Sequence, residues 1–106
     1  IQEITATDLR TGYLFTDKIS AEETVLDCQP KHMYRAWHVP NSENHELEEL
    51  MQNFKKLDKT KRYVLYCTYG SQTPYVAEVM QQFGYEAYAF QGGINQVKRL
   101  YQTEAH

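Results

Sequence analysis

A cysteine, Cys67, stands where an apolar run gives way to a polar loop in the stretch YVLYCTYGSQTPYVAEVMQQFG. Gly70 gives this loop access to backbone angles that other residues resist. Thr73 and Pro74 are typical of a helix N-cap and of the first helical position, so a helix is predicted to begin there. Residues 67–72 must therefore curl between a strand and a helix, and such a loop can point successive N–H groups inward.

Inward-pointing N–H groups and the positive end of a helix both stabilise an anion, so a sulfur held among them favours the thiolate form. A thiolate is a nucleophile, and the same groups would hold a persulfide, a thiosulfonate or a phosphate-like group. The competing interpretation is a strand-end cysteine that only packs. We predict that Cys67 is the catalytic nucleophile. The predicted anion-binding loop comprises Thr68, Tyr69, Gly70, Ser71, Gln72 and Thr73.

Strands and helices alternate in the sequence pattern. Apolar runs predict strands at residues 24–28, 62–67 and 86–90, with weaker ones at 37–39 and 3–5. Apolar residues at helical spacing form three stripes: Leu47, Leu50, Met51, Phe54 and Leu57; Val76, Val79, Met80 and Phe83; and Ile94, Val97, Leu100 and Tyr101. This alternation implies an α/β fold with a parallel sheet and helices on both faces.

Several residues are predicted to end or begin these helices. Ser42 or Asn44 would cap the first stripe, and Gly84 would end the second in a left-handed conformation. Residues 6–11 predict a short helix that ends at Gly12. The working site of a parallel sheet lies at the carboxyl ends of its strands, where Asp27 is expected to accept hydrogen bonds from loop amides.

Composition narrows the function classes. The chain has 106 residues and a net charge of −3, which suit one domain (residues 1–106) without a broad basic surface for nucleic acid. Two cysteines make neither a disulfide framework nor a four-ligand zinc site, and the histidines lack ligand spacing, so we expect no metal and no cofactor. We find no membrane-length apolar run and no signal peptide, so we expect a cytoplasmic protein without membrane contact. The chain begins with Ile, not Met, which favours an excised domain or a processed product.

Three stretches of the sequence resemble a rhodanese-like domain, and together they span most of the chain. VLDCQPKHMYRAWHVPNS is similar to the first family signature, which Asp27, Tyr34, His38 and Pro40 match. YCTYGSQT resembles the six-residue active loop, with Cys67 in the persulfide-forming position, and FQGGINQVK resembles the closing signature. The resemblance implies a three-layer α/β/α fold around a central, mostly parallel five-stranded sheet.

The resemblance also implies sulfurtransferase chemistry. The Cys67 thiolate would take the outer sulfur of a donor, either a small molecule such as thiosulfate or a persulfide-bearing protein, and become a persulfide. It would pass that sulfur to cyanide, a thiol or a partner protein's cysteine. Backbone N–H groups of residues 68–72 would stabilise the developing charge, and Ser71 and Thr73 would add hydroxyl donors. Such domains also occur in larger enzymes, including the tRNA 4-thiouridine sulfurtransferases, so a parent enzyme that thiolates tRNA is another implied partner.

The chain departs from the family pattern at charged positions. Family members often carry Arg two residues after the Asp and Glu four residues beyond that Arg, where this chain has Gln29 and Met33. They also often carry Arg after the Cys or at the last loop position, where Thr68 and Gln72 stand. A loop without a cation disfavours a dianionic donor such as thiosulfate, whereas a protein-bound persulfide is less affected.

Some hypotheses stay open at this level. A rhodanese-like sheet would place Cys28 beside Cys67, so Cys28 is either a small buried residue or a resolving thiol that attacks the persulfide and leaves a disulfide. The domain could instead be a non-catalytic binding or regulatory module. A Cys-dependent phosphatase would need Arg six residues after the Cys, where Thr73 stands.

Residues near the proposed site carry weaker predictions. Trp37 and His38 are expected to be structural, and Tyr69 is expected to shape access to the loop. The basic residues between positions 55 and 62 form either a solvated turn or a contact with tRNA or an acidic partner.

Overall fold

A parallel sheet forms the centre of the protein. The structure, a computed structural model, describes residues 14–68 and 70–104. Within these residues the strand order is β1-β5-β4-β2-β3, and every neighbouring pair is parallel. The strands are β1 (Phe15–Thr16), β2 (Thr24–Asp27), β3 (Glu43–Asn44), β4 (Arg62–Tyr66) and β5 (Glu86–Phe90).

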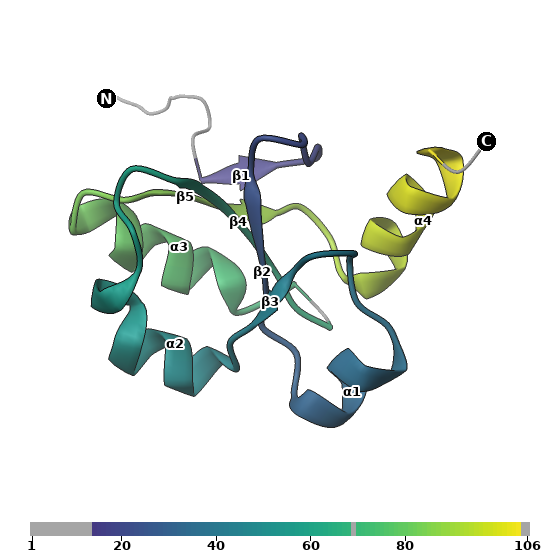
Figure 1. Ribbon diagram of the computed structural model, residues 1–106, viewed down its shortest axis with the longest axis horizontal. Helices are drawn as coiled ribbons and strands as arrows, with labels where there is room; N and C mark the ends of the chain where they lie inside the picture. Colours follow the sequence, from purple (N-terminus) through teal and green to yellow (C-terminus); the bar gives the residue numbers. More distant parts are fainter. Residues whose placement is uncertain (1–13, 69, 105–106) are drawn as a thin grey trace.

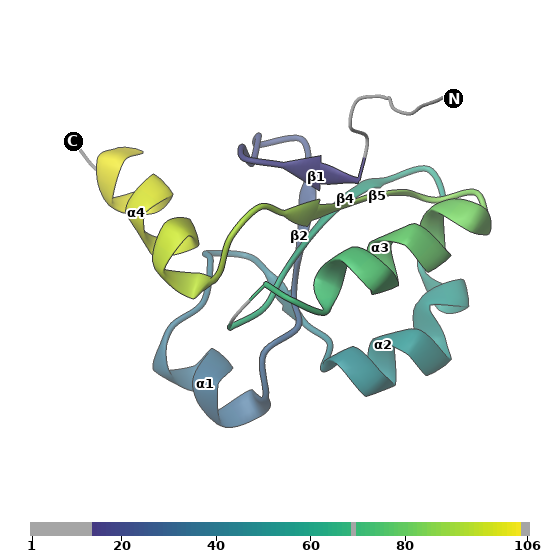
Figure 2. The same cartoon turned by 180° about the vertical axis from the view of Figure 1, so that it is seen from behind.

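Helices provide the crossover connections that parallel strands require. They are α1 (Lys31–Ala36), α2 (Leu47–Asn53) with the 3₁₀ turn η1 (Phe54–Lys56), α3 (Thr73–Gln82) and α4 (Ile94–Glu104). Helices α2 and α3 lie on one face of the sheet and α4 lies on the other (Figures 1 and 2). This arrangement confirms the expected three-layer α/β/α fold. In the described part of the chain, no helix has the length and apolarity to cross a membrane.

The central strand β4 separates two cores. Tyr63 and Leu65 point into the core beneath α2 and α3, whereas Val64 and Tyr66 point into the core beneath α4. All four are at most 2% exposed. A strand buried on both faces reads as a continuous apolar run, which explains why the sequence pattern at residues 62–67 predicts it well.

The predicted extra strand at residues 37–39 is wrong. Its last residue, Val39, is buried, but its N–H donates to the Tyr66 hydroxyl instead of to a neighbouring strand. Pro40 then has no N–H to continue a ladder. The additional strand is β3, a few residues further on, where Glu43 and Asn44 pair with β2. The strand at residues 3–5 and the helix at residues 6–11 fall outside the described residues.

The helix boundaries differ from the predicted ones by a few residues. Glu46, not Ser42 or Asn44, precedes α2, and its side chain makes no capping hydrogen bond. Asn44 instead donates its side-chain amide to two main-chain oxygens near the end of β2. Thr73 is the first residue of α3, and Gln72 occupies the cap position. The first apolar stripe is interrupted, because α2 gives way to η1 and Leu57 is extended.

The glycine predicted to end the second helix has the expected conformation. Gly84 follows the end of α3 with φ of +93°. A positive φ costs glycine nothing because it has no Cβ.

Candidate active site

Cys67 directly follows the central strand β4, at the carboxyl edge of the sheet. Its neighbour across the ladder is the end of β2, and the Cys28 N–H donates to the Tyr66 carbonyl over 2.8 Å. The Cys67 thiol is partly buried and lies 3.9 Å from the Cys28 carbonyl oxygen. The structure therefore brings both cysteines to one edge, as the strand adjacency predicted, and both thiols are free.

The Cys67 side chain opens into a cavity of about 330 Å³. Its described lining residues are Cys28, Pro30, Met33, Glu46, Leu47, Glu48, Cys67, Thr68 and Gln72. Among these residues the charged side chains are both acidic, Glu46 and Glu48. Sequence reasoning missed this acidic rim, because it depends on how the start of α2 packs against the loop after β4.

The loop after Cys67 is held against the turn that follows β5. A Cβ atom on Gly70 would lie 2.3 Å from the Gly92 carbonyl oxygen, so only glycine fits at this approach. Gly70 also has φ of +74°. On the other side of the loop, the Ile94 N–H donates to the Thr68 carbonyl over 3.0 Å. The closing Gly-Gly signature thus positions the loop, while Tyr69 lies outside the described residues.

Thr68 joins the loop to the segment that follows β2. Its hydroxyl lies 3.4 Å from the Gln29 Oε1 atom and 3.4 Å from the Met33 sulfur. Gln29 is 2% exposed, and its Nε2 donates to the Asp27 carboxylate and to the Trp37 carbonyl. Three of the four uncharged residues at these positions, Gln29, Met33 and Thr68, are therefore linked by contacts of the Thr68 hydroxyl beside Cys67.

Asp27 supports this edge of the sheet and does not face the cavity as a base. The carboxylate is fully buried and accepts hydrogen bonds from the Gln29 N–H, the Gln29 side chain and the Tyr66 hydroxyl. Burial and the hydrogen bond to Asp27 raise the pKa of Tyr66, so this hydroxyl stays protonated and keeps donating. The expectation that Asp27 accepts from nearby amides is confirmed.

Cys28 is much less exposed to solvent than Cys67. It is 2% exposed and belongs to the core beneath α2 and α3. Burial raises the pKa of Cys28 well above its usual value, and the nearby Cys67 and Asp27 raise it further. Cys28 therefore remains a protonated thiol at neutral pH.

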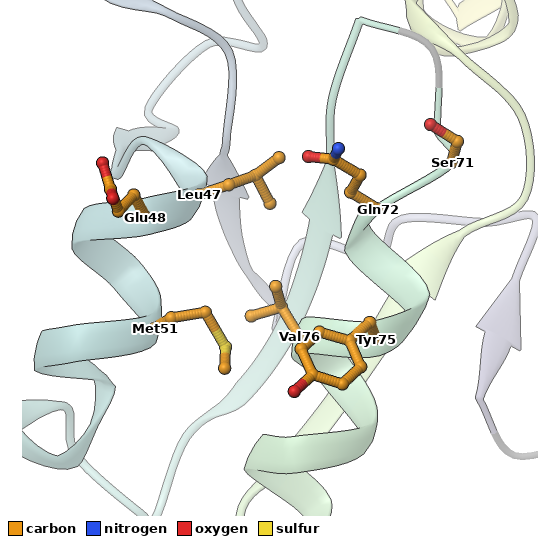
Figure 3. A pocket seen from close by; sticks show the side chains of 7 residues that line it. All are labelled: Leu47, Glu48, Met51, Ser71, Gln72, Tyr75 and Val76. Carbon is orange, nitrogen blue, oxygen red and sulfur yellow. The ribbon is translucent and has the colours of Figure 1, made fainter.

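A second cavity of about 450 Å³ extends from the Cys67 cavity between α2 and α3. Leu47, Glu48 and Gln72 line both cavities. Figure 3 shows Leu47 and Met51 on α2 facing Gln72 and Val76 across the space. The other lining residues are Ser71 and Tyr75, and Tyr75 is 63% exposed. We call this second cavity the α2–α3 groove.

The other predicted loop residues take different positions. Ser71 and Gln72 are exposed at the α2–α3 groove, whereas Thr73 is fully buried. The Thr73 hydroxyl has no hydrogen-bond partner among the described residues. A threonine in that position cannot clamp phosphate as the arginine of a phosphatase loop does, which speaks against phosphatase chemistry.

The remaining predicted residues are structural or distant. The His38 ring stacks on Tyr34, and its Nδ1 lies 2.8 Å from the Tyr34 carbonyl. Trp37 packs in the core beneath α4, as expected. The basic residues 55–62 run from η1 to the first residue of β4, and that residue is at the opposite end of the strand from Cys67. Within residues 14–68 and 70–104, no three His, Cys, Asp or Glu side chains form a group that could hold a metal.

Comparison with known proteins gives the chain a family. A model of the Rhodanese-like domain matches residues 13–100. A tRNA sulfurtransferase of Thermoplasma acidophilum is 34% identical over 80 residues, which cover 76% of this chain and 16% of that protein. A tRNA sulfurtransferase of Pyrobaculum aerophilum is 29% identical over 80 residues with the same coverage of both proteins. The chain thus spans 16% of the length of these curated relatives.

Solved structures show the same fold. A rhodanese-related protein from Thermoplasma volcanium aligns with a TM-score of 0.67 and 24% identity, covering 77% of this chain and 79% of that chain. A rhodanese-like domain protein from Staphylococcus aureus aligns with a TM-score of 0.65 and 19% identity, covering 73% and 76%. Because the family model matches most of the chain, the chain belongs to the rhodanese-like domain family.

Proposed function

We propose that this domain is a sulfurtransferase that carries sulfane sulfur as a persulfide on Cys67. The observation that carries the proposal is the position of this thiol, which is partly exposed at the carboxyl end of the central strand and opens into a cavity. Relatives named tRNA sulfurtransferase support the same chemistry.

The proposed reaction has two transfers. The Cys67 thiolate attacks the outer sulfur of a donor persulfide, the S–S bond of the donor breaks, and the donor leaves as a thiolate. An acceptor nucleophile then attacks the outer sulfur of the Cys67 persulfide, and the Cys67 thiolate is restored. Dividing one transfer into two displacements is covalent catalysis.

The loop supplies the proposed stabilisation of negative charge. Backbone N–H groups of residues 68 and 70–72 would donate to the sulfur that carries charge, and the start of α3 would add its positive dipole. The Thr73 hydroxyl, which has no partner among the described residues, would be a further donor. The hydrogen bond from Ile94 to the Thr68 carbonyl and the close approach of Gly70 to Gly92 would position the loop before the donor binds.

The acidic rim favours a protein persulfide over thiosulfate as the donor. Thiosulfate is a dianion, and Glu46 and Glu48 would repel it at the entrance. A protein donor can bring basic residues beside its persulfide and can place apolar side chains in the α2–α3 groove. We therefore propose that a persulfide-bearing segment with basic and apolar residues docks along this groove and reaches Cys67.

The proposed setting is a longer protein. The curated relatives are named tRNA sulfurtransferase, and this chain corresponds to 16% of their length. In such a protein the domain would supply sulfur to a tRNA site built elsewhere in the chain. The basic residues 55–62 lie away from Cys67, so a tRNA contact through them would not place RNA at the sulfur.

The test uses a chain with one thiol, so that the site of loading is unambiguous. Cys28→Ala would be treated with thiosulfate, with inorganic polysulfide and with a persulfide-loaded protein donor, and its intact mass measured without reductant. We expect the mass of one added sulfur, located on Cys67 by peptide mapping, with Cys67→Ala as the unreactive control. If none of the three donors adds sulfur to Cys67, the proposal is wrong, and a non-catalytic binding module becomes the favoured hypothesis.

A further inference from the structure

Cys28 and Cys67 occupy matching positions on neighbouring strands. β2 and β4 pair in register up to Asp27 and Tyr66. The next residues along the two strands are the two cysteines, and the Cys28 N–H continues the ladder to the Tyr66 carbonyl. Paired residues on neighbouring strands have backbones about 4.8 Å apart, inside the range of about 4.4–6.8 Å between Cα atoms that a disulfide spans.

Both side chains also lie on the same face. Cys28 belongs to the core beneath α2 and α3, and Cys67 packs against that core. Both line the cavity of about 330 Å³. A sulfur bound to Cys67 would therefore share a cavity with the Cys28 thiol, while Cys28 is almost fully shielded from solvent.

We propose that Cys28 is a resolving thiol, which attacks the Sγ atom of a Cys67 persulfide and closes a Cys28–Cys67 disulfide. This proposal rests on the proposed function, because the persulfide must form first. A new bond joins the two Sγ atoms, and the bond between Cys67 Sγ and the outer sulfur breaks. The outer sulfur takes the Cys28 proton and leaves as hydrogen sulfide.

The electrons balance without an external oxidant. The two cysteines lose two electrons, the outer sulfur gains two, and the Cys28 proton leaves with the departing sulfide. A thiol reductant is needed afterwards to restore both cysteines for another cycle.

The surroundings of Cys28 suit a thiol that reacts only with its neighbour. Burial keeps external donors and oxidants from Cys28. Because its pKa is raised, the Cys28 thiol must pass its proton to the departing sulfide as it attacks. The two cysteines directly follow the paired residues Asp27 and Tyr66, so a sulfur on Cys67 would lie within reach of Cys28. Cys28 would thus act after Cys67 and would not compete with it for the donor.

The test compares the wild-type chain with Cys28→Ala after loading with inorganic polysulfide, with excess donor removed and no reductant added. We expect the wild type to lose the added sulfur, release one equivalent of sulfide and form a Cys28–Cys67 disulfide, located by non-reducing peptide mapping. Cys28→Ala should keep its persulfide and release no sulfide until a thiol is added. Circular dichroism and thermal unfolding would confirm that the variant is folded.

The outcomes separate this inference from the proposed function. If wild-type Cys67 gains sulfur and keeps it with no disulfide, the resolving role is wrong and the sulfurtransferase proposal stands. If Cys67 gains no sulfur in either protein, the proposed function fails and the resolving role fails with it. Intermolecular disulfides in place of the Cys28–Cys67 pair would also overturn the inference.

Discussion

The contact between Gly70 and Gly92 makes a quantitative prediction about the loop after Cys67. In Gly70→Ala the new Cβ atom would lie 2.3 Å from the Gly92 carbonyl oxygen and 2.8 Å from its carbonyl carbon. Both atoms belong to the main chain, so no side-chain rotation relieves the overlap. The loop and the turn after β5 must move apart, and the Thr68 carbonyl then loses its hydrogen bond from Ile94.

Two terms set the expected loss of stability. A residue with a Cβ atom costs about 1–2 kcal/mol at a left-handed φ, and Gly70 has φ of +74°. Overpacking adds about 1–3 kcal/mol when the neighbours must shift. Gly84→Ala is a matched control, because Gly84 also has a positive φ but its Cβ would meet only the end of the Lys59 side chain at 3.7 Å.

Urea denaturation of the two variants isolates the second term. We expect Gly70→Ala to lose about 1–3 kcal/mol more than Gly84→Ala, which lowers the midpoint by roughly a further 1 M for a domain of this size. Sulfur loading of Cys67 should fall in Gly70→Ala and stay unchanged in Gly84→Ala, since Gly84 is far from the loop. Equal stability of the two variants would show that the close approach to Gly92 is not present in solution.

Three further predictions concern the site and its support. Tyr66→Phe should lower the free energy of unfolding by about 2–4 kcal/mol in urea titration, because the buried Asp27 carboxylate and a buried main-chain N–H each lose their partner on Tyr66. Glu48→Lys should raise the rate at which thiosulfate loads sulfur onto Cys67, roughly three- to tenfold at low salt. Glu49→Lys, on the same helix but outside the cavity, should leave this rate unchanged. Equal rates for the two variants would refute the proposed role of the acidic rim. The free energy of unfolding should fall as the pH rises above about 8.5, by up to about 1.4 kcal/mol per pH unit. The reason is that the Cys28 thiol ionises there in the unfolded chain, while its raised pKa keeps it protonated in the folded protein. Cys28→Ala should show a smaller decrease with pH, and an equal decrease would count against a Cys28 thiol that is shielded from water.

The local sequence pattern predicts the strands that are buried along most of their length. β2, β4 and β5 are buried, so their apolar runs mark them, and the position of Cys67 at the end of β4 follows directly. The strands that sequence reasoning missed, β1 and β3, have two residues each and lie at the edges of the sheet. A strand of two residues is too short to show an alternation of apolar and polar residues, so only its pairing with a neighbouring strand defines it.

Helix α1 escapes prediction for a related reason. Its sequence, KHMYRA, has no apolar stripe, and none of its residues is buried. The acidic rim and the α2–α3 groove also have no local signal. They exist because Leu47 and Glu48 at the start of α2 come to lie beside the loop after β4, a long-range contact that spacing along the chain does not encode.

Under the proposed function, the uncharged residues beside Cys67 would leave the choice of donor to the acidic rim. An arginine at position 29 would place a nearly fully buried cation between Asp27 and Thr68, beside the loop after Cys67. Gln29 brings no charge there: its amide links the Asp27 carboxylate to the hydroxyl of Thr68, and the sulfur of Met33 also contacts that hydroxyl. Neutral side chains thus position the loop, and among the described residues that line the Cys67 cavity the charged ones are the acidic rim, Glu46 and Glu48. In the proposed reaction, a donor that carries its own positive charge would gain from the acidic rim, and a free dianion would not.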